Sequence, residues 1–272
     1  MTEITSTKNE KVKRVASLRE RRGRRKLGRI VIDGLREIGR ALAAGMLVEE
    51  AFFLADSHAS LPDLLDELDR LGAVLHPVAP HVFEKLAFGN RHEGIVVVAQ
   101  PPERGLDDIR LIPQPLIGVV EGVEKPGNLG AIVRTAAAAG LDAIVSADAR
   151  TDLFNPNAIR ASLGCIFSLP VVAASCEQTL RWLTDLGIPI FAARVDGATP
   201  YSSVSYESGA AIVLGSEADG LSAKWQAEGI INICLPMTDL VDSLNVSATA
   251  AVLFYEAARH RHQALDHPPR PS

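Results

Sequence analysis

The feature that most constrains the fold is a series of short apolar runs without polar alternation, separated by segments of helical character. In the second half of the chain these runs read LIGVVEGV, DAIVSA, IPIFAARV, AAIVLG and INICLP. A strand with one solvent-facing side alternates polar and apolar residues, whereas a strand buried on both faces is apolar throughout. Because helices fit between the runs, the sequence predicts an α/β fold with a parallel sheet covered by helices on both faces.

The first half of the chain predicts a smaller α/β unit. Between residues 29 and 99, apolar runs such as RIVID and GIVVVAQ alternate with amphipathic segments such as GLREIGRALAAG. The stretch PPERGLDDIRLIPQP that follows holds four prolines and no apolar period, which is typical of a linker. We therefore predict a first domain over 1–100, a linker over 101–115, a second domain over 116–262 and a disordered tail over 263–272.

Charge is distributed unevenly along the chain. Between Lys8 and Arg29, a segment that we call the basic arm, eleven Lys and Arg residues accompany two Glu, although the net charge of the whole chain is −5. Binding of a polyanion depends on where cations are concentrated, so the arm predicts contact with nucleic-acid phosphates. The alternative is a solvated, mobile N-terminal helix.

The composition, 47% hydrophobic and 22% charged, is that of a globular protein, and no apolar run is long enough to span a membrane. The beginning of the chain lacks the apolar core of a signal peptide, and the three cysteines form neither a paired framework nor a metal-ligand spacing. We therefore expect a cytoplasmic protein without a membrane partner. His76, His81 and His92 do not share a helix face, so we expect no metal.

Ligands of open parallel sheets bind at the carboxyl ends of the strands, so the loops there are the candidate site. Three of them combine glycine or proline with polar side chains: 124–130 after LIGVVEGV, 216–220 after AAIVLG, and the segment after INICLP. Phosphate-loop, dinucleotide, zinc-protease and serine-hydrolase motifs are absent from the sequence.

At these loops the chain resembles a known family. NLGAIVRTAAAAG, VLGSEADGLS and LPMTDLVDSLNVSATAAVLFYE are similar, in order and spacing, to the three motifs of the SpoU (TrmH) family of RNA ribose 2′-O-methyltransferases. In the first half, IVIDGLREIGRALAAG and RHEGIVVVA resemble the ribosomal-protein-like RNA-binding domain that many members carry. The resemblance covers nearly the whole chain. One departure is Ala218, which stands where the second motif often has glycine.

The resemblance implies a fold that periodicity cannot supply, the SPOUT fold, in which the C-terminal segment of the parallel sheet domain forms a deep trefoil knot. It further implies S-adenosylmethionine as the cofactor, RNA as the partner, and a homodimer with each active site near the subunit interface. The residues that it implies for catalysis are Arg134, Asn128, Glu217, Ser243 and Asn245. Those that it implies for the cofactor, bound largely through backbone atoms, are Leu214, Gly215, Leu235, Met237 and Leu244.

Each of these residues also has a simpler interpretation. Arg134 could form a surface ion pair, Glu217 could cap or salt-bridge the next helix, and Asn128 could be a turn residue. Gly215 could serve packing alone, and the Ser243–Asn245 pair could be an ordinary helix cap. Within the resemblance we interpret Arg134 as orienting the ribose 2′-oxygen and a nearby phosphate, because a guanidinium with a pKa above about 12 is a poor base. Proton removal by this arginine is the family's usual assignment.

The function that we predict is S-adenosylmethionine-dependent 2′-O-methylation of a ribose in RNA, with 23S rRNA favoured. The alternatives are methylation of tRNA, a non-catalytic RNA- or ribosome-binding protein that retains the fold, and a methyltransferase of small molecules, which the basic arm disfavours.

Overall fold

The computed structural model describes residues 2–56, 61–87, 93–197 and 199–266. They form two compact units, unit 1 with Met1–Glu103 and Phe154–Ser168, and unit 2 with Arg104–Leu153 and Leu169–Ser272. Residues 154–168 thus fold with unit 1, although they lie inside the second domain predicted above. The domain limits of 1–100, 101–115 and 116–262 stay a prediction.

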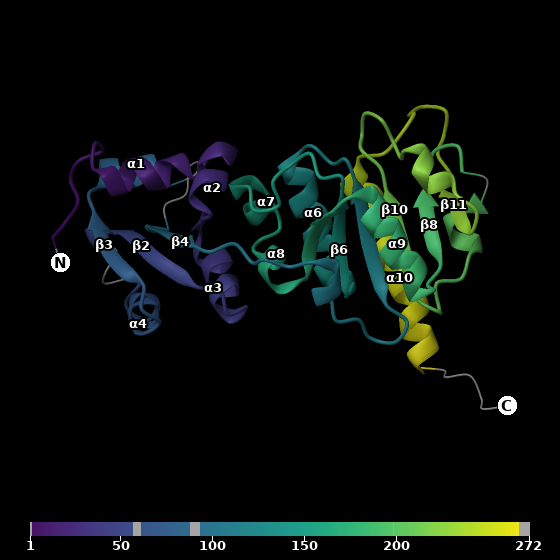
Figure 1. The fold of residues 1–272 in the computed structure, drawn as a ribbon, viewed down its shortest axis with the longest axis horizontal. Coiled ribbons are helices and arrows are strands. Elements are labelled where there is room, and N and C mark those ends of the chain that lie inside the picture. Colours follow the sequence, from purple (N-terminus) through teal and green to yellow (C-terminus); the bar gives the residue numbers. More distant parts are fainter. Residues whose placement is uncertain (1, 57–60, 88–92, 198, 267–272) are drawn as a thin grey trace. The chain divides into compact units, whose positions relative to one another are not determined.

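Unit 1 is built on a four-stranded sheet with the order β1-β4-β2-β3 (Figure 1). Strand β4 is antiparallel to β1 and β2, and β2 is parallel to β3. The strands are β1 (Ile30–Asp33), β2 (Val48–Leu54), β3 (Val74–Val78) and β4 (Ile95–Ala99). The helices are α1 (Glu10–Ser17), α2 (Arg21–Leu27), α3 (Leu35–Ala43), α4 (Pro62–Arg70), α5 (Pro80–Leu86), α7 (Pro156–Ala161) and α8 (Cys165–Ser168).

The basic arm begins as a packed helix. Val12 and Val15 of α1 are 0% and 1% exposed and join Phe52 of β2 in the core of unit 1. Asn9 caps α1, because its side-chain oxygen accepts a hydrogen bond from the Lys11 amide at 2.9 Å. Burial of one apolar face fixes α1 on the sheet, so the interpretation of this segment as a solvated, mobile helix is wrong.

Unit 2 holds a seven-stranded sheet with the order β7-β6-β5-β10-β8-β11-β9, and all its neighbouring strands are parallel. The strands are β5 (Leu116–Glu121), β6 (Ala143–Ala147), β7 (Val171–Ala174), β8 (Ile190–Ala193), β9 (Thr199–Pro200), β10 (Ala210–Leu214) and β11 (Ile230–Cys234). The helices are α6 (Pro126–Ala139), α9 (Cys176–Leu186) and α10 (Val246–Asp266), with short 3-10 turns η2 (Leu106–Asp108), η3 (Tyr201–Ser203) and η4 (Ala223–Gln226).

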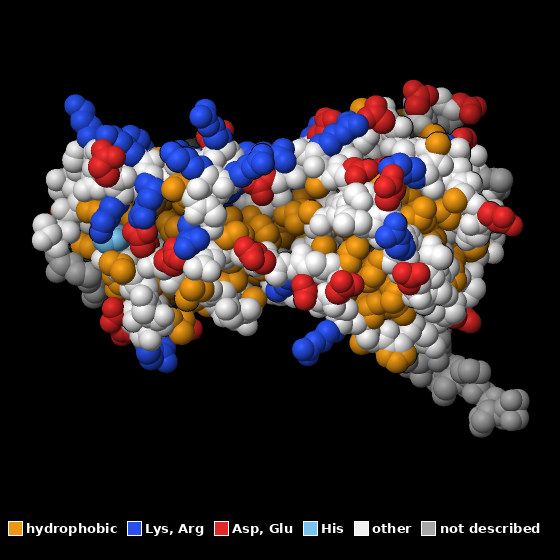
Figure 2. Space-filling model, in the orientation of Figure 1, with side chains coloured by type: hydrophobic (Ala, Val, Ile, Leu, Met, Phe, Trp, Pro, Cys, Tyr) orange, Lys and Arg blue, Asp and Glu red, His pale blue; other side chains and the backbone are white. Residues whose placement is uncertain are grey.

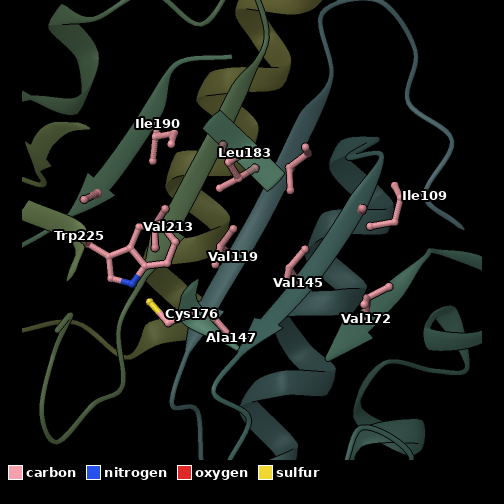
Figure 3. Close-up of a cluster of buried hydrophobic side chains, with 14 residues drawn as sticks. Ile109, Val119, Val145, Ala147, Val172, Cys176, Leu183, Ile190, Val213 and Trp225 are labelled. Carbon is pink, nitrogen blue, oxygen red and sulfur yellow. The ribbon is translucent and has the colours of Figure 1, made fainter. Parts of the chain in front are cut away.

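Helices cover both faces of this sheet, as predicted. On one face Val119, Val145 and Val213 pack against Leu183 of α9 and the fully buried Trp225 of η4 (Figure 3). On the other face a Cβ added at Gly118 of β5 would lie 2.8 Å from the Phe254 ring of α10, so helix and strand approach closely there. Every residue of β5, β6 and β10 is buried, which explains their continuous apolar sequence.

Several details differ from the expectations. Strands β7 and β9 did not follow from the apolar pattern, and α10 runs to Asp266, into the segment predicted as a disordered tail. Residues 267–272 of that tail lie outside the described residues, as does His92. The trefoil knot that the resemblance implies stays a prediction. Within the described residues, no helix combines the length and apolarity that a membrane span requires.

Candidate active site

The candidate site of unit 2 lies where β5, β10 and β11 end. These strands are parallel, so their carboxyl ends share one edge of the sheet. After β10 the chain makes a tight turn in which the Ser216 amide donates to the Gly220 carbonyl at 3.2 Å and the Gly220 amide donates back at 3.1 Å. Glu217 lies within that turn, next to Ser216.

Three side chains converge on the Glu217 carboxylate, and we call the four residues together the Glu217 cluster. Lys125 Nζ donates to Oε2 at 2.6 Å, while Asn128 Nδ2 and Asn245 Nδ2 donate to Oε1 at 2.8 Å and 2.5 Å. The three donors come from the start of α6 and from the residue before α10. The structure therefore brings together Asn128, Glu217 and Asn245 of the predicted catalytic set.

The electrostatics of the cluster keep Glu217 ionised. The hydrogen bond from Lys125, followed by that from Asn128, lowers the pKa of Glu217 below its ordinary value of 4.5. The same contact raises the pKa of Lys125. The Lys125 side chain is 72% exposed, so solvent screens this ion pair and its main role is to orient the carboxylate.

A pocket of about 460 Å³ opens beside the cluster, within the range of about 300–1,000 Å³ that is usual for ligand sites. Its lining includes all five residues predicted to bind the cofactor, and Glu217 and Ser243 of the predicted catalytic set. A smaller hollow of about 210 Å³ shares Ser216, Glu217 and Ala218 with it and is also lined by Asn128. The pockets and the Glu217 cluster together thus contain nine of the ten predicted positions.

Gly215 is required for the shape of the pocket. A Cβ at this position would lie 2.2 Å from the Gly220 carbonyl carbon, closer than real side chains allow. The missing side chain lets the 216–220 turn fold back onto the end of β10 and leaves backbone groups facing the pocket. Ala218, in contrast, is not among the residues with positive φ, so its methyl group fits the turn without backbone strain.

Ser243 and Asn245, the polar pair before α10, have different surroundings. Asn245 Oδ1 accepts from the Ser247 amide at 2.9 Å and from its hydroxyl at 2.6 Å, so Asn245 caps the helix while its Nδ2 serves Glu217. Ser243 is exposed and lines the pocket. The interpretation as an ordinary cap is therefore correct for Asn245 but incomplete. Asn128 is not a turn residue, because α6 already begins at Pro126.

Arg134 is the predicted catalytic residue that lies apart from the cluster. It is exposed on α6 and makes no hydrogen bond or ion pair with the described residues. It follows Asn128 by six positions, which places the two side chains about 9 Å apart along the helix axis and on different sides of it. The surface ion pair considered for Arg134 is thus absent from the described part of the chain, and Arg134 lines neither hollow.

The basic arm of unit 1 contains two kinds of cation. Arg14 pairs with Glu50, and Arg29 donates to Glu49 at 2.5 Å, which holds the arm against β2. Arg22, Arg25 and Lys26 of α2 are exposed, and their side chains make no contact of this kind with the described residues. Figure 2 shows Lys and Arg side chains gathered over the region where Figure 1 labels α1 and α2.

The structure adds residues that the sequence did not single out. Lys125 belongs to the cluster, and Arg194 and Asp196 line the large pocket. Arg194 is within the apolar run IPIFAARV and comes directly after β8, so the rule that ligands bind at strand ends could have drawn attention to it. His76 packs on the Phe52 ring and His81 contacts the Thr5 carbonyl at 2.8 Å, so both have structural roles.

Two acids and one thiol lie close together elsewhere on the carboxyl edge of the unit 2 sheet. Ligand atoms of Glu121, Asp148 and Cys176 lie within 4.8 Å of one another. Burial, followed by the charge of Glu121, raises the pKa of the Cys176 thiol to about 11, so this sulfur is protonated at neutral pH. Glu121 accepts from the Ser222 amide at 2.8 Å and from its hydroxyl at 2.7 Å, which satisfies the buried carboxylate without a cation.

The pocket lies at the carboxyl edge of a parallel sheet, and its shape depends on Gly215. An ionised acid held by lysine and amide donors lies next to it. These features are those of an α/β enzyme that binds a cofactor at this edge. Residues 115–255 match the SpoU rRNA Methylase family and residues 9–97 match the MRM3-like substrate binding domain. The chain therefore belongs to the SpoU (TrmH) family of S-adenosylmethionine-dependent RNA 2′-O-methyltransferases.

Individual relatives match nearly the whole chain. The 23S rRNA (guanosine(2553)-2′-O)-methyltransferase RlmP of Bacillus subtilis is 29% identical over 94% of this chain and 98% of its own length. A crystal structure of an RNA 2′-O ribose methyltransferase is 38% identical, with a TM-score of 0.82 over 96% of this chain and all of that one. An AdoMet-bound rRNA methyltransferase from Sinorhizobium meliloti is 25% identical, with a TM-score of 0.88 over 95% and 98%.

The pocket of this chain fits S-adenosylmethionine. Its lining includes apolar side chains such as Leu214 and Leu235, which suit an adenine ring, and Gly215 and Gly220, which line the pocket with backbone atoms alone. Glu217 supplies a negative charge for a cofactor that carries a sulfonium. When bound, the cofactor supplies an electrophilic methyl group.

Proposed function

We propose that this chain transfers a methyl group from S-adenosylmethionine to a ribose 2′-oxygen of rRNA, and of 23S rRNA in particular. The observation that carries the proposal is the Glu217 cluster beside the large pocket. In this cluster two asparagines that are predicted to be catalytic, Asn128 and Asn245, donate hydrogen bonds to one ionised acid. The choice of 23S rRNA is supported by RlmP, whose length the chain matches almost completely. Other relatives are described as tRNA/rRNA methyltransferases, which keeps tRNA as the alternative.

The residues of the chain would act mainly by positioning. In-line displacement requires donor, methyl carbon and acceptor oxygen in a row, and rigid placement of the partners supplies much of the rate. Asn128 and Asn245 are both fixed by Glu217. The Asn128 amide oxygen would orient the ribose, whereas Asn245 Oδ1 already accepts two hydrogen bonds from Ser247. Arg134 would orient the 2′-oxygen and an adjacent phosphate.

Arg134 lies apart from the cluster of its own chain and lines neither hollow, so we propose that the enzyme is a homodimer in which Arg134 serves the site of the second copy. Mixing Arg134→Ala with Glu217→Gln subunits tests this arrangement. Each mixed dimer would hold one intact site, so activity should return to about a quarter of the wild-type value after random exchange. Activity no higher than that of the separate variants would contradict a shared site.

The experiment that tests the function is transfer of radiolabelled methyl groups to total RNA from cells that lack the modification, followed by mapping of the label. Label at one ribose of 23S rRNA is the expected result. Label in tRNA would favour the alternative substrate, and RNA binding without any transfer would favour a non-catalytic RNA- or ribosome-binding protein. A cytoplasmic location also stays a proposal, for which the three free cysteines are the supporting observation.

A further inference from the structure

Arg194 lies at the rim of the large pocket, in a turn that is fixed to the neighbouring strand. Its amide donates to the Ile233 carbonyl of β11 at 2.9 Å, and the Gly197 amide closes the turn on the Arg194 carbonyl at 3.3 Å. A Cβ at Gly197 would lie 2.6 Å from the Ile233 carbonyl oxygen, so the turn approaches β11 as closely as glycine permits. The backbone of Arg194 is thus held in place before any ligand binds.

The guanidinium of Arg194 is oriented and only partly satisfied. Nε donates to Asp196 Oδ1 at 2.8 Å and Nη2 donates to Oδ2 at 3.2 Å, which uses one edge of the planar group. Nη1 is buried and has no hydrogen-bond partner among the described residues. The bond from Asp196 raises the pKa of Arg194, so the group is a permanent cation. A buried donor without an acceptor is costly, so the Nη1 side of the guanidinium is the one that would gain from an acceptor supplied by a ligand.

The charges around the pocket make Arg194 distinctive. Among the described residues that line it, Arg194 is the one cation, whereas Asp196, Glu217 and Asp219 are acids. Glu217 is paired with Lys125, and Asp219 with Arg150 at 3.0 Å, two cations outside the lining. An anionic group that enters the pocket therefore meets a favourable partner at Arg194, while cationic groups are favoured near the acids.

S-adenosylmethionine has one anionic group, the carboxylate of its methionyl part, beside a cationic ammonium and sulfonium. We propose that the Arg194 guanidinium binds this carboxylate through its Nη1 side, while Asp196 fixes the orientation of the guanidinium through Nε and Nη2. The proposal rests on the proposed function, because it concerns the cofactor of the same site. The competing interpretation is that Arg194 and Asp196 only stabilise their turn.

Calorimetric titration with two ligands separates these interpretations. S-adenosylhomocysteine has the methionyl-type carboxylate, whereas 5′-methylthioadenosine has the same nucleoside without the amino-acid part. Arg194→Met keeps the apolar length of the side chain and removes its charge. We expect it to weaken S-adenosylhomocysteine about 10- to 100-fold, the value of a charge-assisted hydrogen bond, and to change the affinity for 5′-methylthioadenosine by less than about threefold. Arg194→Lys should recover part of the loss.

An equal loss for both ligands, or no loss for either, would overturn the proposal. If Arg194→Met does not fold, the wild-type chain still decides, because decarboxylated S-adenosylhomocysteine lacks only the carboxylate and should bind about 10-fold more weakly than the parent compound. Similar affinities for these two ligands would exclude a carboxylate site. Failure of the proposed function would look different. A non-catalytic RNA-binding protein would bind none of these ligands, whereas an enzyme with another RNA target would bind them as described here and differ only in where the methyl label is found.

Discussion

The Glu217 cluster and the basic arm both consist of charged and polar side chains, but they are organised in opposite ways. In the cluster, three donors from two segments of unit 2 that are distant in sequence meet one carboxylate at 2.5–2.8 Å. In the arm, Arg22, Arg25 and Lys26 point to solvent without partners among the described residues. Fixed geometry is what a reaction centre needs, whereas an exposed set of cations is sufficient to attract phosphates.

This difference predicts different responses to substitution. Removal of one group from a fixed constellation affects rate or cofactor affinity strongly and is insensitive to salt. Removal of cations from the arm affects RNA affinity by increments and changes its dependence on salt. The predictions below begin with the largest expected effect.

Arg134 tests whether an exposed cation without a partner belongs functionally to the fixed site or to the diffuse surface. If it orients the 2′-oxygen, Arg134→Ala should lower kcat for methyl transfer about 1,000-fold, and Arg134→Lys should retain part of the rate. Cofactor affinity, measured by calorimetry with S-adenosylhomocysteine, should stay within about threefold because Arg134 lies outside the pocket. Near-wild-type turnover in both variants would remove Arg134 from catalysis.

Glu217→Gln tests the fixed constellation itself. Glutamine keeps the size of the side chain but presents an amide donor to one of its neighbours, so we expect kcat/KM to fall about 30-fold. Because the folded pKa of Glu217 lies below 4.5, the carboxylate contribution is present above that pH and is lost only as the pH falls through the lowered pKa. The ratio of wild-type to variant rates should therefore stay constant between about pH 6 and 8.

The control for this variant is Glu177→Gln, which disrupts the exposed pair with Lys224 at 3.3 Å and should leave the rate unchanged. A wild-type to variant ratio that changes steeply near neutral pH would mean that Glu217 is not ionised in the way the cluster requires.

Particular residues show which parts of these two regions could be predicted from the sequence. The strands of unit 2 followed from their almost continuous apolar sequence, because burial on both faces favours apolar side chains at nearly every position. The loops at strand ends followed from the parallel sheet, and the positions of Asn128, Glu217 and Asn245 from the resemblance. The convergence of those three side chains on one carboxylate depends on strand order and on turns, which local sequence does not encode.

Other features lacked a local signal. Lys125 was within a recognised loop, but nothing in the sequence distinguished it from the neighbouring Glu124. Strand β7 is only four residues long, and its sequence VVAA does not differ from that of a helix. Residues 154–168 fold with unit 1 although the chain on both sides belongs to unit 2, an arrangement set by tertiary contacts alone.

The basic arm should respond incrementally. The triple variant Arg22→Ala, Arg25→Ala and Lys26→Ala should lower affinity for a 23S rRNA fragment about 10-fold near physiological salt and reduce the slope of log affinity against log salt by about 2. Fluorescence anisotropy over a series of salt concentrations measures both quantities. The matched control replaces Arg36, Arg70 and Lys85, three exposed cations of unit 1 outside the arm. Equal losses in the two triple variants would show that net charge, and not the arm, governs binding.

Ala218→Gly should have the smallest effect, although it restores the glycine that the second motif often carries. Ala218 lines both hollows, but its φ is not positive, so the turn does not require glycine at this position as it requires the absence of a side chain at Gly215. We expect the affinity for S-adenosylhomocysteine to change by less than about threefold, and the free energy of unfolding to fall by about 0.5–1 kcal/mol because glycine gains more freedom in the unfolded chain. Calorimetric titration and denaturant unfolding measure the two quantities. A gain in affinity of 10-fold or more would mean that the methyl group narrows the pocket, and that the fixed region of this chain is not yet optimal for its cofactor.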